Sequence, residues 1–219
     1  MTSKRIFTWG GFVVIVGLII WGLIAAEMKS NKEQELLPLP EQIVATDHIK
    51  GSEMAPVTLV EYGDFQCPAC QTYHSMVEQL ISELGSSTVR FVFRHFPLAQ
   101  HANAMISSLA AEAAGSQGKF WEMYDILYKE QREWENVKDP TSIFVKYAQN
   151  INLDIEKFKT DLTSEQAKER IINDYKGGVK AGIVGTPTFF VNGKQIASPK
   201  SLNEFKDIIN KAATAGVNP

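Results

Sequence analysis

The stretch VEYGDFQCPAC, residues 60–70, decides the fold. It completes a β-branched, largely apolar run at residues 57–62, which predicts a strand buried on both faces. Cys67 and Cys70 then open a segment whose apolar residues recur at helical spacing, and Pro68 lies in the first turn, where a helix accepts proline. The pattern therefore predicts a buried strand that leads through a pair of thiols into a helix.

Outward from this stretch the pattern continues as a second strand, a long helical region, two short strands and a last helix. The dipeptide Asn192-Gly193 separates two short apolar runs, which is a strong hairpin signal. We predict an α/β domain at residues 48–219 with a helical insertion at about residues 101–180. The expected elements are a strand at 88–94, helices at 101–115, 119 to about 131, 140–150, 153–162 and 165 to about 180, strands within 187–197, and a helix from near Ser198-Pro199.

The composition is that of one globular domain. The chain has 219 residues, of which 44% are hydrophobic, 10% aromatic and 21% charged. Its formal net charge is −3, with 22 Lys and Arg against 25 Asp and Glu, so no excess positive charge is available to neutralise a phosphate backbone. We expect no nucleic-acid partner.

The first residues indicate a membrane anchor. Residues 6–26 carry no charge, and a helix of that length spans about 31 Å, close to the thickness of a bilayer core. The alternative, a cleaved secretory signal, has a shorter apolar region and a small residue upstream of the cleavage point. Lys4 and Arg5 precede the span, which favours a cytoplasmic N-terminus at residues 1–5. We expect a single-pass protein of the cell membrane, with residues 27–47 as a polar linker and the domain on the extracytoplasmic side.

Cys67 and Cys70 are the only cysteines, and their position suggests redox chemistry. Unpaired N–H groups and the positive end of the helix dipole favour a thiolate at Cys67, and only a thiolate attacks a disulfide. Cys70 lies one helical turn further on, close enough to form a disulfide with Cys67. Two alternatives remain open at this point: a metal site that adds His74 to the two cysteines, and a static structural disulfide. We expect no bound metal and no cofactor.

Two other features accompany the cysteines. Glu61 lies in the otherwise buried strand, where desolvation would raise its pKa and allow it to exchange a proton with Cys70. The alternative for Glu61 is an edge-strand charge that faces water. The sequence Gly185-Thr186-Pro187 leads into the strand FFV, and base rates alone favour a trans bond before this proline.

Four motifs in order resemble one family. VEYGDFQCPAC, FRHFPL, FWEMYDILY and VGTPTFFVNG are similar to those of the DsbA-like thiol-disulfide oxidoreductases of the thioredoxin superfamily, over about residues 50–216. The resemblance implies a thioredoxin fold in which Cys67 attacks, Cys70 resolves and Glu61 is the buried acid beneath them. It also implies a cis bond at Pro187, with the backbone of Thr186 pairing with a substrate strand.

The resemblance also implies an activity. DsbA has Pro-His between its cysteines, whereas this chain has Pro68-Ala69, which removes one source of thiolate stabilisation. We therefore expect a reduction potential between about −120 mV, the value for DsbA, and about −270 mV, the value for thioredoxin.

We predict a protein dithiol-disulfide oxidoreductase that introduces disulfides into exported cysteine-containing proteins and is reset by a membrane redox partner. The alternatives are a reductase or isomerase of the same fold, and a metal-binding or metal-delivery module that uses Cys67, Cys70 and His74. Five other histidine and aromatic residues have no catalytic role in this prediction, and we expect them to pack the insertion against the sheet. They are His95, His101, Phe120, Trp121 and Tyr124.

Overall fold

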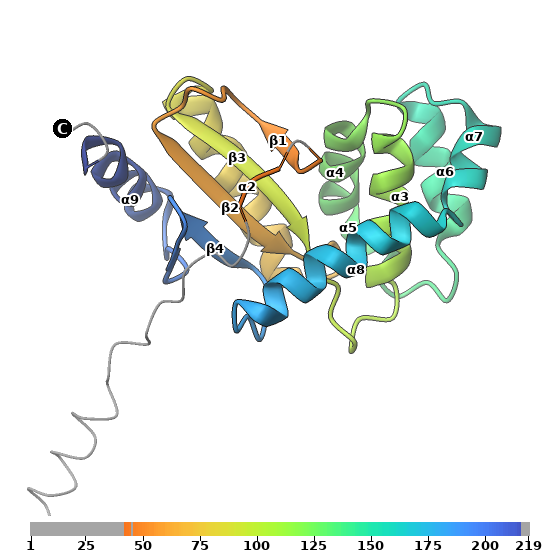
Figure 1. Ribbon diagram of the computed structural model, residues 1–219. Coiled ribbons are helices and arrows are strands. Elements are labelled where there is room, and N and C mark those ends of the chain that lie inside the picture. The colour runs from red at the N-terminus through yellow and green to blue at the C-terminus, as the bar shows by residue number, and fades with distance from the viewer. Residues whose placement is uncertain (1–41, 45, 216–219) are drawn as a thin grey trace, which may run out of the picture. The chain divides into compact units, whose positions relative to one another are not determined.

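The computed structural model describes residues 42–44 and 46–215 (Figure 1). The predicted N-terminus, the predicted span at residues 6–26 and most of the predicted linker lie outside the described residues. Within the described part of the chain, no helix is both long and apolar enough to cross a bilayer.

A five-stranded mixed sheet forms the centre, in the order β1-β3-β2-β4-β5. Strands β2 and β3 run parallel, and the other three pairs are antiparallel. Strand β2 is the middle strand and is buried on both faces, as its sequence predicts. The strands are β1 at His48–Lys50, β2 at Val57–Gly63, β3 at Val89–His95, β4 at Thr188–Val191 and β5 at Lys194–Ile196.

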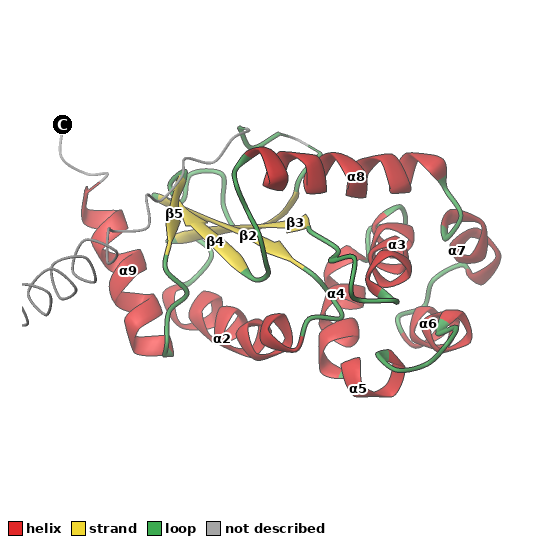
Figure 2. Cartoon of the chain, turned by 90° about the horizontal axis from the view of Figure 1, so that it is seen from below, coloured by secondary structure: helices red, strands yellow, loops and turns green. Residues whose placement is uncertain are grey.

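Helices cover both faces of the sheet and extend it at one end. Figure 2 shows α2 and α9 on one face, α8 on the other, and α3 to α7 gathered beyond the sheet. This is a thioredoxin fold with a helical insertion, so the predicted fold class is confirmed for the described residues. The helices are α2 at Pro68–Leu84, α3 at Ala104–Gly115, α4 at Phe120–Lys129, α5 at Gln131–Trp134, α6 at Thr141–Asn150, α7 at Ile155–Asp161, α8 at Glu165–Lys180 and α9 at Leu202–Ala215.

Two helices start later than predicted. Helix α3 begins three residues after His101, whose ring Nδ1 lies 2.7 Å from Asp64 Oδ2 in a turn. Helix α9 begins after Ser201, whose hydroxyl accepts a hydrogen bond from the Glu204 N–H at 3.2 Å. Serine is a favoured N-cap, which places the start after it and not near Ser198.

The sequence pattern also missed a strand and a break. The short strand β1 was not predicted, because its three residues are too few to show an alternation. The helix expected from residue 119 to about 131 is divided at Glu130 into α4 and α5. The predicted hairpin is confirmed: Asn192 and Gly193 both have positive φ, 46° and 79°, between β4 and β5.

Aromatic side chains join the insertion to the sheet. Phe93 of β3 lies 5.1 Å from Tyr124 of α4 between ring centroids, and Phe65 lies 5.2 Å from Phe93. Trp121 donates to the Ile49 carbonyl at 3.3 Å. The aromatic residues of the FWEMYDILY motif therefore seat the insertion on the sheet, as the sequence predicts.

On the opposite face, α8 approaches the sheet closely at one glycine. A Cβ at Gly178 would lie 2.6 Å from two ring carbons of Phe96 and 3.1 Å from the ring of Tyr62. Contacts this short do not occur between real side chains, so only glycine allows α8 to lie against these two rings.

A buried ion pair holds the segment before β1 against the sheet. Arg94 of β3 donates to both oxygens of the Asp47 carboxylate at 3.0 Å, and both side chains are 3% exposed. Arg94 also donates to the Tyr62 hydroxyl at 3.1 Å and to the Gln42 carbonyl at 3.0 Å. Gln42 and Asp47, in the last part of the predicted linker, therefore contact the domain through this arginine.

Replacement of Arg94 by methionine should destabilise the domain strongly. Arg94→Met keeps most of the side-chain volume but leaves the Asp47 carboxylate buried without its cation, at a cost of about 3–5 kcal/mol in the free energy of unfolding. Urea unfolding of the purified domain measures this loss. The double variant Asp47→Asn with Arg94→Met should recover part of it, and equal losses in the single and double variants would contradict the ion-pair explanation.

Candidate active site

Cys67 precedes the first turn of α2 and has the geometry of an N-cap residue. Its φ and ψ are −72° and 121°, and Pro68 follows at the first helical position. The Cys67 N–H donates to the Asp64 carbonyl at 3.0 Å, and the Cys67 carbonyl accepts from the Gln71 N–H at 3.1 Å. No side-chain cap occupies the helix N-terminus, so its N–H groups are available to the Cys67 sulfur.

These surroundings favour the thiolate of Cys67. The hydrogen bond from the Cys70 thiol lowers the pKa of Cys67 most, and the Thr186 side chain and the N–H groups of Cys70 and Ala69 lower it further. Burial acts in the opposite direction, yet the pKa still falls to about 5. The residue is 6% exposed, whereas Cys70 is fully buried.

Cys70 has the opposite character. It is fully buried, and burial raises its pKa well above the ordinary thiol value, as does its role as donor to Cys67. Both cysteines are free in this structure. The two sulfurs are therefore unequal: one is poised to react as an anion, and the other holds its proton.

Glu61 lies in the middle of the sheet and not at an edge. Its residue is fully buried, and neither carboxylate oxygen has a hydrogen-bond partner among the described residues. Desolvation, with the nearby charge of Cys67, raises the pKa of Glu61 to about 8. The charge of Glu61 in turn acts on Cys70 and raises the pKa of that thiol. The predicted neighbourhood of the buried acid and the cysteines is present.

The loop before β4 completes the site. The bond between Thr186 and Pro187 is cis, as the resemblance implies. The Cys67 thiol donates to the Thr186 carbonyl at 3.4 Å, so this loop lies directly against the first cysteine. In the sheet, Thr188 pairs with Tyr62 at the end of β2, which is why residues distant in sequence meet here.

His74 does not join the cysteines. Its Nε2 lies 2.9 Å from Asp125 Oδ1. Among the described residues, two groups of potential ligands lie close enough to share an ion, and neither contains a cysteine. They are His48, His95 and Glu112, and His74, Glu78 and Asp125. In each group the glutamate already pairs with a cation, Arg170 or Lys50. The arrangement gives no support to a metal site built from Cys67, Cys70 and His74.

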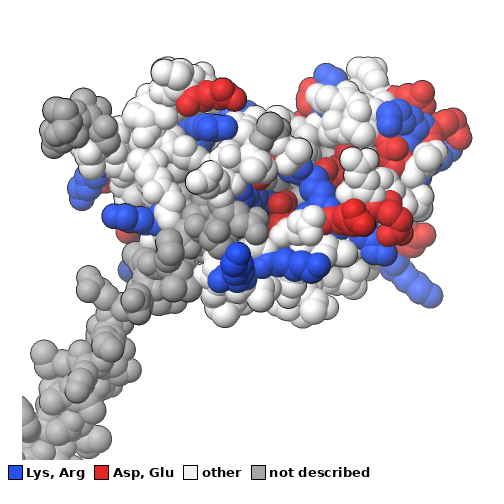
Figure 3. Space-filling view, in the orientation of Figure 1, with Lys and Arg blue, Asp and Glu red and all other residues white. Residues whose placement is uncertain are grey.

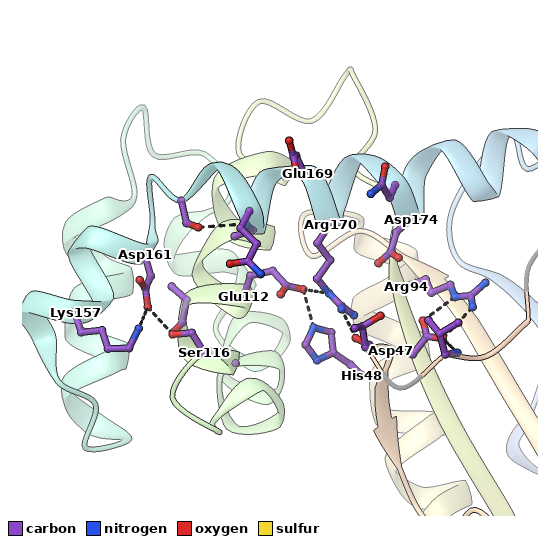
Figure 4. Close-up of a pocket in the computed structure, with 18 of the residues that line it drawn as sticks. Asp47, His48, Arg94, Glu112, Ser116, Lys157, Asp161, Glu169, Arg170 and Asp174 are labelled. Atoms are coloured by element: carbon purple, nitrogen blue, oxygen red, sulfur yellow. Dashed lines mark hydrogen bonds and ion pairs between the residues drawn. The ribbon is translucent and has the colours of Figure 1, made fainter.

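His48 and Glu112 of the first group line a cavity of about 890 Å³ between the segment before β1, α3 and α8 (Figure 4). Glu112 Oε1 lies 2.6 Å from His48 Nε2 and 2.8 Å from Arg170 Nε. Burial opposes ionisation of Glu112, but hydrogen bonds from His48 and His95 hold its pKa well below the usual range. Figure 3 shows acidic and basic side chains close together on this face. Glu112 and Arg170 in the cavity wall are thus already paired with each other.

Sequence reasoning missed Asp64, which anchors the loop before Cys67. Its side chain is fully buried and accepts hydrogen bonds from the N–H groups of Gln66 and Leu98 at 2.8 and 2.9 Å, in addition to its contact with His101. Its position between a buried strand and the first cysteine was the only available signal. An aspartate there is equally typical of a turn.

Comparison with known proteins agrees with this geometry. The family model described as Thioredoxin matches residues 44–211. The structure of BdbD from Bacillus subtilis is similar with a TM-score of 0.72 and 25% identity, over 82% of this chain and 98% of BdbD. The structure of alpha-DsbA1 from Wolbachia pipientis is similar with a TM-score of 0.71 and 22% identity, over 80% of this chain and 94% of that protein.

A curated relative is longer than the matched region. The Na(+)/H(+) antiporter NhaA 1 of Salinispora arenicola is 41% identical over 186 residues, which is 81% of this chain but 28% of the antiporter. The chain thus spans little more than a quarter of that relative, and the antiporter activity is not transferred with the similarity.

A CxxC pair at a helix N-terminus, facing a cis-proline loop in a thioredoxin fold, defines a class of thiol-disulfide exchange proteins. The chain belongs to the thioredoxin family. Within it the chain has the fold of the DsbA-like thiol-disulfide oxidoreductases.

Thiolate absorbance should show Cys67 ionising at a pKa of about 5 in the reduced domain. The ordinary thiol pKa is 9.0, so between these two values the folded protein carries a thiolate that the unfolded chain lacks. In this pH range the unfolded state binds more protons than the folded state. The free energy of unfolding therefore rises with pH above about 5, and the contribution of Cys67 is lost as the pH falls through about 5. A midpoint near 9 in the reduced domain would contradict the proposed nucleophile.

Glu61→Gln should slow the release of mixed disulfides. A carboxyl with a pKa of about 8 is ionised in part near neutral pH, and this fraction can take the proton of Cys70, whereas an amide cannot. We expect the internal attack by Cys70 to slow by about a hundredfold, measured on a mixed disulfide between Cys67 and a small thiol. The Cys67 titration serves as the control and should stay close to its wild-type midpoint. Equal release rates in the variant and the wild type would remove Glu61 from the mechanism.

Proposed function

We propose that this protein is a membrane-anchored, extracytoplasmic oxidase that introduces disulfides into exported proteins. The observation that carries the proposal is the stabilised thiolate of Cys67 beside a protonated Cys70. A stabilised reduced form makes the disulfide form a stronger oxidant, because the reaction toward the dithiol becomes more favourable. This supports the oxidase over a reductase, which needs a less stable reduced form.

The reaction balances between two dithiols. A substrate thiolate attacks Cys67 Sγ of the Cys67–Cys70 disulfide, and the S–S bond breaks with its electron pair on Cys70, which takes a proton. A second substrate thiolate then attacks the substrate sulfur of the mixed disulfide, and Cys67 leaves as the thiolate. The enzyme gains two electrons and the substrate loses two. An oxidising partner must remove them before the next turnover.

Glu61, Thr186 and Pro187 have supporting roles in this proposal. Glu61 gives a proton to Cys70 when the enzyme disulfide opens, and accepts it when the disulfide forms again. The cis-proline loop lies against Cys67, and the backbone of Thr186 offers a place where an extended substrate segment can pair. The substrate class is therefore an extended, cysteine-containing polypeptide.

The location rests on the sequence. The uncharged residues 6–26 have the length of a span, and Lys4 and Arg5 favour a cytoplasmic N-terminus. An extracytoplasmic domain would meet exported proteins that still carry reduced cysteines. The membrane redox partner that resets the cysteine pair would act on the same side.

Cys70→Ala in the full-length chain should accumulate mixed disulfides at Cys67. They form when the Cys67 thiolate attacks a disulfide of an exported protein and displaces one of its sulfurs as a thiolate, and they persist because the thiol that releases them internally is absent. After acid quenching, we expect exported cysteine-containing proteins among the trapped species. Cys67→Ala is the matched control and should trap none. Trapping chiefly of a reducing membrane protein, or a reduction potential below about −270 mV, would favour the reductase instead.

A further inference from the structure

A buried glutamine of the insertion contacts the backbone of the proposed nucleophile. Gln131 is the first residue of α5 and is 1% exposed. Its Nε2 donates to the carbonyl oxygens of Phe65 and Cys67 at 2.6 and 3.1 Å. Burial of an amide is costly unless it is hydrogen-bonded, so these two bonds account for its position. In Figure 2, α5 lies beyond one end of α2.

Two further amides link the same two segments. Gln66 Nε2 donates to the Glu135 carbonyl at 2.6 Å, and Gln66 Oε1 accepts from the Asn103 N–H at 2.6 Å. Asn103 Nδ2 donates to the carbonyls of Trp134 and Val137 at 3.1 and 2.8 Å. The loop before Cys67 is thus hydrogen-bonded to residues 131–137 of the insertion through directional contacts.

The contact of Gln131 with Cys67 lies on the backbone and not on the sulfur. The Cys67 carbonyl also accepts the first helical hydrogen bond, from Gln71 N–H, so Gln131 holds the peptide unit at which extended backbone changes into helix. The orientation of that peptide unit sets the direction of the Cα–Cβ bond of Cys67. It therefore also sets the position of the sulfur over the first N–H groups of the helix.

We propose that Gln131 is a positioning residue for the exchange reaction, which fixes the Cys67 backbone so that its sulfur meets the N–H groups of the first turn of α2. The inference rests on Cys67 as the nucleophile of the proposed function. It gives the insertion a part in the reaction centre besides covering the sheet. Displacement of α5 would then change the reactivity of Cys67 without any contact to the sulfur.

Gln131→Met tests this, because methionine keeps the length of the side chain and removes the donor. We expect the Cys67 midpoint to rise by about one pH unit, which leaves about fivefold less thiolate at pH 5, and alkylation of Cys67 at that pH to slow by the same factor. Gln71→Met is the matched control, because the Gln71 side chain donates instead to the Tyr128 carbonyl, at 3.0 Å. Its titration should match the wild type.

A second measurement uses the unaltered domain in case Gln131→Met does not fold. The side-chain amide of Gln131 should give resolved NMR signals with slowed hydrogen exchange, and these signals should shift between the disulfide and dithiol forms. The inference would be overturned if Gln131→Met folds and its Cys67 titrates as in the wild type. It would also be overturned if the Gln131 amide signals are the same in the disulfide and dithiol forms. Either result alongside a normal wild-type midpoint near 5 leaves the proposed function intact. A wild-type midpoint near 9 would instead defeat the nucleophile itself.

Discussion

The site depends on one electrostatic arrangement, a thiolate held at the N-terminus of α2. The first N–H groups of a helix have no partner within it, and a sulfur anion placed over them satisfies them while they stabilise its charge. A conventional side-chain cap would compete for these donors, and Cys67 occupies the N-cap position without one. The helix start is thus less well capped than serine or aspartate would make it, and its donors serve the thiolate instead.

A second constraint on the site is the buried carboxyl of Glu61 in the sheet. Glu61 is in the middle strand with no hydrogen-bond partner among the described residues, so its charged form is expensive and its neutral form is favoured. Burial raises the pKa of Glu61, whereas the N–H groups at the helix N-terminus lower the pKa of Cys67. The two pKa values, about 8 and about 5, fall on either side of neutral pH. Near neutral pH Glu61 therefore mostly holds a proton that it can give to Cys70, while Cys67 can leave as a thiolate.

Local pattern was enough to predict the elements that build this site. The strand at 57–62, the helix after Cys67 and the Asn192-Gly193 hairpin follow from apolar spacing and turn chemistry, and the structure confirms all three. The cis bond at Pro187 needed the family resemblance, since base rates favour trans. The roles of Asp64 and Gln131 could not be predicted from the sequence. Asp64 accepts from the N–H of Leu98, and Gln131 donates to the carbonyl of Phe65. Hydrogen bonds between residues so far apart in the chain produce no periodic pattern in the sequence.

Aromatic packing alone would not fix the position of the Cys67 sulfur, and the polar contacts of the insertion add to it. Phe93 and Tyr124 hold the insertion on the sheet, but apolar contacts are non-directional and tolerate small shifts. A sulfur over helix N–H groups tolerates less, since hydrogen bonds weaken steeply with distance and angle. Directional amide contacts such as that of Gln131 supply the missing precision. The reaction centre is consequently shared between the thioredoxin core, which provides the sulfurs and the buried acid, and the insertion, which fixes the backbone that carries the first sulfur.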